Sequence, residues 1–216
     1  MTCLIIATGN AHKAQEIRAI LGGQASEWRT LADFPEAPSV CEDAGSFSGN
    51  ALKKARTLAQ WLAQQPAGQS LGSDAWVLAD DSGLEVDALH GAPGVHSARF
   101  AAQDAAVAAN CTDADNNAKL LRLLAGVAED ARTARFRCSL ALVRVGDAAH
   151  QFFEGNCEGR IRRDEAGGGG FGYDPLFVPQ GYDRSFAQLD GAVKNRISHR
   201  ARALEKLAQH LGARAG

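Results

Sequence analysis

Two adjacent carboxylates near position 80 constrain the fold of this chain more than any other feature of the sequence. The segment Leu78-Ala79-Asp80-Asp81-Ser82-Gly83-Leu84 predicts a buried strand that runs into a turn at the two aspartates. Burying a carboxylate costs roughly several kcal/mol unless a cation or hydrogen bonds compensate its charge. Other segments of the chain must therefore bring compensating groups to this point.

Two interpretations of Asp80 and Asp81 are open from this segment alone. An Asp-Ser-Gly sequence is common in turns and helix caps, where the carboxylate has only a local structural role. Paired carboxylates also hold Mg²⁺ beside a phosphate group. The rest of the sequence has to decide between them.

Apolar patterns predict a fold that mixes strands with helices. Strands are expected at Leu4–Ala7, Trp76–Ala79, Arg132–Val145 and Gln151–Ile161. Helices are expected after Asn10 up to the Gly22-Gly23 pair, after Asn50, over Asn116–Leu124, and along the final stripe from Ile197 to Leu211. Residues Gln64–Asp74 are expected to form a surface loop. Because strands and helices do not alternate strictly, we expect an α/β (α+β) fold with a mixed sheet.

Length and composition are typical of a soluble globular enzyme with one domain. The chain has 216 residues, 45% of them hydrophobic, and shows no internal repeat or long linker, so a single domain over residues 1–216 is expected. A net charge of -2 argues against nucleic acid or an anionic membrane as a partner. Five scattered cysteines without a C-x-x-C pair argue against a zinc site or a disulfide framework. No signal or membrane segment is recognised, and we expect a cytoplasmic protein.

The segment Thr8-Gly9-Asn10-Ala11-His12-Lys13 lies where the first strand is expected to pass into a helix. The start of a helix offers free N–H groups and a partial positive charge, which favour a phosphate group. Gly9 allows a close approach of the backbone, and Lys13 adds a full charge. The spacing is not that of a Walker A loop. An ordinary strand–turn–helix with a surface lysine is the alternative.

Three further segments could carry chemistry. Glu42 precedes a helix with Lys53 and Lys54, and its carboxylate could reach a metal that Asp81 also binds, although a solvated acidic loop has the same sequence. Four glycines precede Phe171-Gly172-Tyr173-Asp174, which offers a stacking face and an acceptor for a nucleobase, or alternatively a hairpin with a core phenylalanine. The basic segment Lys194–Arg200 could bind an anion or form the surface of an amphipathic helix.

In this order, the segments resemble the inosine triphosphate pyrophosphatase family. The resemblance covers nearly the whole chain and rests on Ala7–Lys13 with Glu16, Phe47–Lys54, Leu78–Leu84 with Gly91–Val95 and Ser97–Phe100, Gly169–Pro175, and Lys194-Asn195 with Ile197–Arg200. The family implies a long curved mixed sheet flanked by helices, with two lobes and a substrate cleft between them. It also implies a homodimer that requires Mg²⁺.

The resemblance further implies that deaminated purine nucleotides (ITP, dITP and XTP) are hydrolysed to the monophosphate and pyrophosphate, which cleanses the nucleotide pool. Two alternatives remain on the sequence alone. One is a purine nucleotide sensor that does not hydrolyse its ligand. The other is a hydrolase of pyrimidine nucleoside triphosphates.

The same resemblance implies a role for individual residues. Asp81 is expected to be the general base and a metal ligand, with Glu42 as the other metal carboxylate, while Asp80 is either a second ligand or orients Asp81. The residues expected to hold the triphosphate are Thr8, Gly9, Asn10, Lys13, Lys54, Ser82 and Lys194. Phe171 is expected to stack on the purine, and the residues expected near the base or at its edge are Gly172, Tyr173, Asp174, His199 and Arg200.

Overall fold

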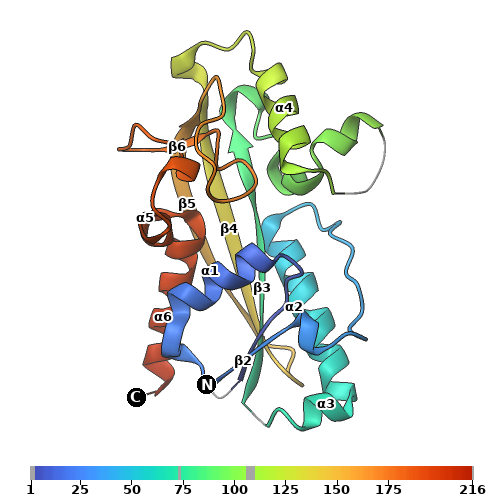
Figure 1. Ribbon diagram of the computed structural model, residues 1–216. Coiled ribbons are helices and arrows are strands. Elements are labelled where there is room, and N and C mark those ends of the chain that lie inside the picture. Colours follow the sequence, from blue (N-terminus) through green and yellow to red (C-terminus); the bar gives the residue numbers. More distant parts are fainter. Residues whose placement is uncertain (1–2, 73, 106–109, 216) are drawn as a thin grey trace. The chain divides into compact units, whose positions relative to one another are not determined.

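The computed structural model describes residues 3–72, 74–105 and 110–215 (Figure 1). Its strands are β1 (Cys3–Ile6), β2 (Glu27–Thr30), β3 (Ala75–Val86), β4 (Thr133–Arg144), β5 (His150–Ile161) and β6 (Phe177–Pro179). Its helices are α1 (Ala11–Leu21), α2 (Phe47–Gln64), α3 (Pro66–Gln69), α4 (Asp113–Leu123), α5 (Gly191–Ile197) and α6 (His199–Ala215). The strands form one sheet in the order β2-β1-β3-β4-β5-β6. Strand β1 pairs in parallel with β2 and β3, whereas β5 and β6 are antiparallel, so the sheet is mixed, as expected.

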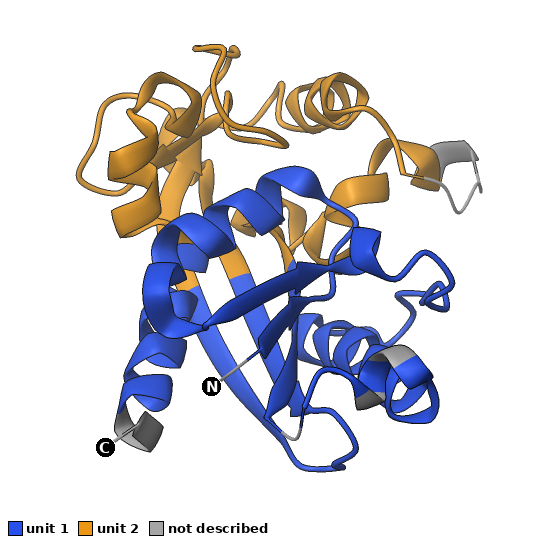
Figure 2. Ribbon diagram, turned by 60° about the horizontal axis from the view of Figure 1, so that its bottom comes forward, with its two compact units in different colours: residues 1–81, 138–155, 200–216 blue, residues 82–137, 156–199 orange. Residues whose placement is uncertain are grey.

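The chain divides into two compact units, shown in Figure 2. Unit 1 contains residues 1–81, 138–155 and 200–216, and unit 2 contains residues 82–137 and 156–199. Strands β3, β4 and β5 each begin in one unit and end in the other. That residues 1–216 act as a single domain stays a prediction.

In unit 1, neighbouring residues of β3 belong to two different cores. Val77 and Ala79 pack in a cluster with the buried face of α2, whereas Leu78 packs in a second cluster with residues of α1 and α6. This is the alternation of a strand whose two faces are both covered by helices. Because the alternation continues along the chain, it also separates the side chains of Asp80 and Asp81.

The core of unit 2 is built around aromatic rings. Phe136 of β4 packs against Phe177 of β6, with ring centroids 4.7 Å apart, and against Phe186. Leu120 of α4 and Leu84 of β3 complete this cluster. The core also supports the segment from Phe171 to Asp174, because Tyr173 belongs to the same cluster.

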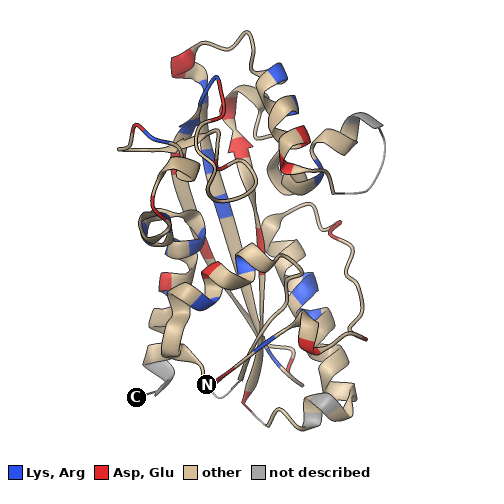
Figure 3. Cartoon of the chain, viewed as in Figure 1, with Lys and Arg blue, Asp and Glu red and all other residues tan. Residues whose placement is uncertain are grey.

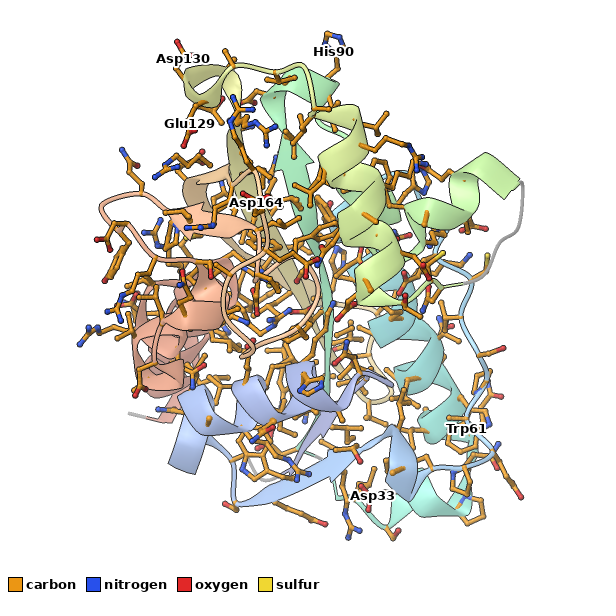
Figure 4. All side chains as sticks on the ribbon, turned by 45° about the horizontal axis from the view of Figure 1, so that its top comes forward. Asp33, Trp61, His90, Glu129, Asp130 and Asp164 are labelled. Atoms are coloured by element: carbon orange, nitrogen blue, oxygen red, sulfur yellow. The ribbon has the colours of Figure 1, made fainter. Side chains whose placement is uncertain are left out.

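Two expected boundaries are wrong. Strand β3 does not end at the aspartates but continues to Val86, since each carboxylate finds compensating partners on its own face of the sheet. Helix α2 begins before Asn50 rather than after it, and its N-cap is Ser46, whose hydroxyl accepts from the backbone N–H of Gly49 at 3.1 Å. Farther along α2, the ring of Trp61, labelled in Figure 4, packs edge-on against Phe34.

Other elements agree with the sequence patterns or refine them. Helix α1 ends at Leu21, and Gly22 after it has a φ of +47°, which glycine adopts without strain. The expected loop over Gln64–Asp74 contains the short helix α3, and the expected final helix is interrupted at Ser198, between α5 and α6. None of the five cysteines, all of them within the described residues, takes part in a disulfide. In the part of the chain that the structure describes, no helix is both long and apolar enough to cross a membrane.

Candidate active site

Asp80 and Asp81 are adjacent in β3, and their carboxylates have separate sets of partners. Asp81 follows Ala79 on the face covered by α2, and Asp80 follows Leu78 on the face covered by α1 and α6. Both side chains are buried. The pair therefore forms two polar clusters in unit 1, one on each side of the sheet.

The Asp81 cluster is organised by Lys54. The ammonium of Lys54 donates to the carboxylates of Asp81 at 3.0 Å and Glu42 at 2.7 Å, and to the main-chain oxygen of Asp80 at 2.8 Å. These contacts use all three donors of the ammonium. The side-chain amide of Asn50 donates to the other Asp81 oxygen at 3.2 Å. The cluster thus consists of two carboxylates that converge on one cation.

Burial and charge act in opposite directions on this cluster. Burial raises the pKa of the Asp81 carboxyl above its usual value, although Lys54 and Lys13 oppose the shift. Burial lowers the pKa of the Lys54 ammonium, but the attraction of Asp81 and Glu42 outweighs this effect, and the net shift is upward. A carboxylate of raised pKa in a polar, partly accessible cluster is suited to accept a proton from water.

The donor set of the cluster fits a magnesium ion. Within the described residues, no three His, Cys, Asp or Glu side chains form a group that could hold a metal on their own. Protein sites for Mg²⁺, however, commonly supply one or two carboxylates and complete the coordination with water and substrate phosphates. Glu42 and Asp81 form such a pair, and the ammonium between them occupies a position where positive charge is stabilised. Metal binding by these two residues stays a prediction.

The Asp80 cluster contains several ion pairs. Asp80 accepts from the ammonium of Lys13 at 2.5 Å and from Nε of Arg200 at 2.9 Å, and the thiol of Cys138 lies 3.2 Å from it. Arg200 also donates to Glu16 at 2.5 Å. Burial alone would raise the pKa of the Asp80 carboxyl, but Arg200 and Lys13 hold it well below its usual range. These partners favour the ionised form of the carboxylate, and both of its oxygens accept hydrogen bonds.

The segment before α1 forms the helix N-terminus that the sequence predicts. The side chain of Asn10 accepts from the backbone N–H of Lys13 at 3.1 Å, and the hydroxyl of Thr8 accepts from the N–H of Asn10 at 3.2 Å. Thr8 and Gly9 line a hollow of about 430 Å³ that also includes Arg18. The segment thus places hydroxyl, amide and backbone groups next to the lysine that reaches Asp80.

In unit 2, the segment from Phe171 to Asp174 is folded around the Asp174 carboxylate. One of its oxygens accepts from the backbone N–H of Phe171 at 2.9 Å and from the ammonium of Lys194 at 2.5 Å. The same ammonium lies 4.6 Å from the centroid of the Phe171 ring, a distance typical of a cation–π contact. Gly170 has a φ of +73°, and a Cβ at this position would lie 2.1 Å from the Asp174 carboxylate. Only glycine fits there.

Helix α4 holds the same segment from another direction. The backbone N–H of Gly172 donates to Asp113 at 2.6 Å, and its carbonyl accepts from the side chain of Asn117 at 3.2 Å. The hydroxyl of Tyr173 donates to the main-chain oxygen of Ser97 at 2.8 Å. Tyr173 and Asp174 are both buried and so support the segment, whereas Phe171 and Gly172 are half-buried at its tip. Contact of these residues with a base stays a prediction.

Three further expected residues, Ser82, Lys194 and His199, lie in unit 2. Ser82 is half-buried on β3 at the start of unit 2. Lys194, expected at the triphosphate, lies beside Phe171 among the residues expected near the base. The ring of His199 stacks on Phe136 with centroids 4.8 Å apart, in unit 2.

Arg200 lies in the Asp80 cluster of unit 1, and its contact with the edge of a base stays a prediction. Its guanidinium is 1% exposed and is bound to Asp80 and Glu16 in unit 1, so its donors are directed to carboxylates of the protein. The bidentate contact with Asp80 is possible because guanidinium presents its donors in a planar fork.

Sequence reasoning did not assign a site role to five residues that the structure brings into these clusters, namely Glu16, Asn50, Asp113, Asn117 and Cys138. The spacing of residues along a helix could have identified two of them. Asn50 and Lys54 are four residues apart and so share a face of α2 toward Asp81, and Lys13 and Glu16 are three apart on α1. No comparable local pattern pointed to Cys138, because its contact with Asp80 is made across the sheet.

Comparisons with known proteins identify the family of the chain. The model of the Ham1 family matches residues 4–210. The chain is 48% identical to a dITP/XTP pyrophosphatase of Opitutus terrae over 95% of this chain and 97% of that protein, and 45% identical to a dITP/XTP pyrophosphatase of Desulforamulus reducens over 96% and 94%. Among solved structures, a HAM1 protein from Coxiella burnetii matches with a TM-score of 0.81 and 35% identity, covering 99% of this chain and all of that one. The Ham1 protein of Staphylococcus aureus matches with a TM-score of 0.79, 31% identity and the same coverage. The chain belongs to the Ham1 family.

Proposed function

We propose that this protein is a nucleoside-triphosphate pyrophosphohydrolase that converts dITP, XTP and ITP to the monophosphate and pyrophosphate. The observation that carries the proposal is the convergence of Asp81 and Glu42 on the single ammonium of Lys54. The relatives from Opitutus terrae and Desulforamulus reducens are dITP/XTP pyrophosphatases, which supports the same reaction and the same deaminated purines. Such a reaction removes damaged nucleotides from the nucleotide pool.

We propose that Asp81 acts as the general base. A water molecule attacks the α-phosphorus, the bond from that phosphorus to the bridging oxygen breaks, and pyrophosphate leaves with that oxygen. The proton of the water passes to the Asp81 carboxylate, whose raised pKa favours its capture. Asn50 holds the second oxygen of this carboxylate and so orients it.

The proposed cofactor is Mg²⁺, held by Glu42 and Asp81. A bound ion would neutralise charge on the pyrophosphate leaving group. Lys54 already lies between the same two carboxylates and supplies a second positive charge for the phosphates. Lys13 and the N-terminus of α1, with Thr8, Gly9 and Asn10, are proposed to bind the rest of the triphosphate.

Recognition of the base is proposed for the segment at the tip of unit 2. Phe171 offers a stacking face, which is typically worth about 1–3 kcal/mol per base. Lys194 places a hydrogen-bond donor 4.6 Å from the centroid of that ring. A donor near the ring suits the 6-oxo group shared by hypoxanthine and xanthine and leaves the 6-amino group of adenine without an acceptor.

We also propose that the protein is a homodimer of the cytoplasm. The homodimer follows from the family resemblance. Five cysteines without a disulfide among the described residues support a reducing compartment.

The test is product analysis with purified protein and dITP, with and without Mg²⁺. Metal-dependent release of pyrophosphate and dIMP supports the proposal, whereas orthophosphate as the product would mean attack at the terminal phosphate and a different mechanism. Tight binding of dITP without any release would instead identify a nucleotide sensor. Turnover of dTTP or UTP in preference to dITP would identify a pyrimidine nucleotide hydrolase.

A further inference from the structure

The hydroxyl of Ser139 is buried in unit 1 without a hydrogen-bond partner among the described residues. Ser139 belongs to β4 and is 2% exposed. Buried polar groups are nearly always paired, because a hydroxyl that leaves water without gaining a new partner lowers stability. An alanine in the same place would avoid this loss. The hydroxyl is therefore explained best by a partner that it gains in another state of the protein.

The pairing of β4 with β3 places Ser139 opposite Asp81. The backbone N–H of Val145 donates to the carbonyl of Ala75 at 2.9 Å, so the end of β4 lies beside the start of β3 and the two strands are antiparallel. Counting back from Val145 and forward from Ala75 by the same number of residues pairs Ser139 with Asp81. Ala141, two residues along β4, packs in the cluster under α2, so Ser139 shares the face on which Asp81 meets Lys54.

Two contacts agree with this register. On the other face, the thiol of Cys138 lies 3.2 Å from Asp80, as expected for diagonal neighbours on paired strands. In unit 2, the hydroxyl of Thr133 donates to Asp87 at 2.6 Å, and the same count makes these two residues opposite each other. Opposite side chains have Cβ atoms about 4.5–5.5 Å apart. A change of the serine rotamer therefore brings its hydroxyl within hydrogen-bond reach of the Asp81 carboxylate.

The contacts of Lys54 indicate when this second partner is needed. In the structure, Lys54 donates to one oxygen of Asp81 at 3.0 Å and Asn50 donates to the other at 3.2 Å. All three donors of the Lys54 ammonium are taken by oxygens of the protein, so a contact with phosphate requires it to give up one of them. When the ammonium leaves Asp81, Asn50 alone no longer fixes the carboxylate against rotation about its Cβ–Cγ bond.

We propose that Ser139 is a positioning residue for Asp81, and that its hydroxyl donates to the carboxylate oxygen that Lys54 leaves when the ammonium turns to the phosphates of the nucleotide. The role of Ser139 rests on the proposed function, because it requires Asp81 to be the base and phosphate to be a ligand of Lys54. It explains why a hydroxyl is buried where alanine would pack without an unpaired group.

Ser139→Ala separates this role from a purely structural one. The melting temperature without nucleotide should equal or exceed that of the wild type, because the substitution removes an unpaired hydroxyl. The kcat for dITP should nevertheless fall about tenfold while KM changes by less than about twofold, because the base is oriented less well and the nucleotide contacts remain. Ser139→Thr keeps the hydroxyl and should retain most of kcat. A lower melting temperature with an unchanged kcat would overturn the proposal.

Two further substitutions serve as controls for the melting temperatures. Ser185→Ala removes a buried hydroxyl that donates to the carbonyl of Ala166 at 2.5 Å, and it should lower the melting temperature. Ala141→Ser adds a hydroxyl to the apolar cluster on the same face of β4, and it should also lower it. A loss in Ser139→Ala as large as that in Ser185→Ala would mean that the Ser139 hydroxyl is already paired before nucleotide binds, and would contradict the inference.

A double-mutant cycle with Lys54→Met tests the contact without turnover. Methionine keeps an unbranched side chain but has no donor, so Asp81 loses its contact at 3.0 Å and should gain one from Ser139. Adding Ser139→Ala to Lys54→Met should therefore lower the melting temperature, although Ser139→Ala alone does not. Additive effects of the two substitutions would contradict the inference. If Lys54→Met does not fold, the comparison of kcat between Ser139→Ala and Ser139→Thr decides the question.

Failure of the proposed function and failure of the inference give different results. Coupling between Ser139 and Lys54 in a protein that releases no pyrophosphate from any nucleotide would refute the proposed function and still support the contact between Ser139 and Asp81. A normal kcat for dITP in Ser139→Ala, with pyrophosphate as the product, would refute the inference alone.

Discussion

Asp81 has the surroundings of a base rather than those of a permanent anion. Its neighbour Asp80 accepts from Lys13 and Arg200 and has a pKa well below the usual range, whereas burial raises the pKa of Asp81. Two adjacent aspartates thus have different proton affinities, because β3 directs their side chains to opposite faces of the sheet. Such a divergence between neighbouring carboxyl groups is a common sign of distinct catalytic and structural roles.

Asp81→Asn tests the role of the base. An amide cannot take the proton of the attacking water, so kcat for dITP should fall by about 10²–10⁴-fold, the usual contribution of general-base catalysis. Nucleotide binding, measured by equilibrium dialysis, should persist. Asp87→Asn changes a carboxylate that is paired with Arg135 and Thr133 outside the cluster, and its turnover should match the wild type. Normal turnover by Asp81→Asn would remove this residue as the base.

Lys54→Gln tests the cation between Glu42 and Asp81. Without its ammonium the two carboxylates are left with an uncompensated charge, and breaking a buried pair typically costs about 3–5 kcal/mol. The melting temperature should therefore drop in metal-free buffer, and added Mg²⁺ should restore more of it than it adds to the wild type. Lys53→Gln is the matched control, because its partner Asp43 is exposed. An equal Mg²⁺ response in all three proteins would argue against metal binding at this pair.

At the scale of elements, α2 and β3 align the functional side chains through the regular spacing of their residues. One face of α2 supplies both Asn50 and Lys54 to Asp81, and the alternation of β3 directs Asp80 away from them. The segment around Phe171 has no such regular element. Its shape comes from glycines and from hydrogen bonds to Asp174 and α4.

Gly170→Ala tests that segment. The new Cβ would lie 2.1 Å from the Asp174 carboxylate at a φ of +73°, so Asp174 must shift away from Lys194. We expect a stability loss larger than the roughly 1 kcal/mol of a left-handed alanine, together with a raised KM for dITP. Gly181→Ala has a similar φ of +84° with open space around the Cβ, so it should show the strain alone. A KM for Gly170→Ala equal to that of Gly181→Ala would show that the segment does not depend on Asp174.

At the scale of the whole molecule, basic and acidic residues are intermixed over both units, as Figure 3 shows. This agrees with the net charge of -2 and with a small anionic ligand bound by local lysines rather than by a general basic field. The residues expected to bind phosphate are mostly in unit 1, and those expected to bind the base are mostly in unit 2.

The oligomeric state is a separate prediction at this scale. Light scattering coupled to size-exclusion chromatography should give twice the mass of the chain over the micromolar range. A mass equal to one chain at all concentrations would contradict the homodimer without affecting the residue assignments above.

The sequence predicted the elements better than it predicted the contacts between them. Local apolar patterns were sufficient for β1, β4, β5 and the end of α1 at Gly22, because each depends on neighbours in the chain. The expected turn at Asp80 was wrong, since the groups that allow the strand to continue come from Lys13, Lys54 and Arg200, far away in sequence. The same holds for Arg200, whose position in a basic segment gives no sign of a buried ion pair with Asp80.

The most direct test of the account is the ratio of kcat/KM for dITP and XTP to that for dATP, with pyrophosphate as the measured product and Mg²⁺ present. A base site that pairs with the 6-oxo group should favour the deaminated purines by about 10²-fold or more, because the mismatched base leaves a buried donor unpaired. We expect this preference together with one pyrophosphate per monophosphate formed. Equal rates for dITP and dATP, or orthophosphate in place of pyrophosphate, would contradict the proposed function.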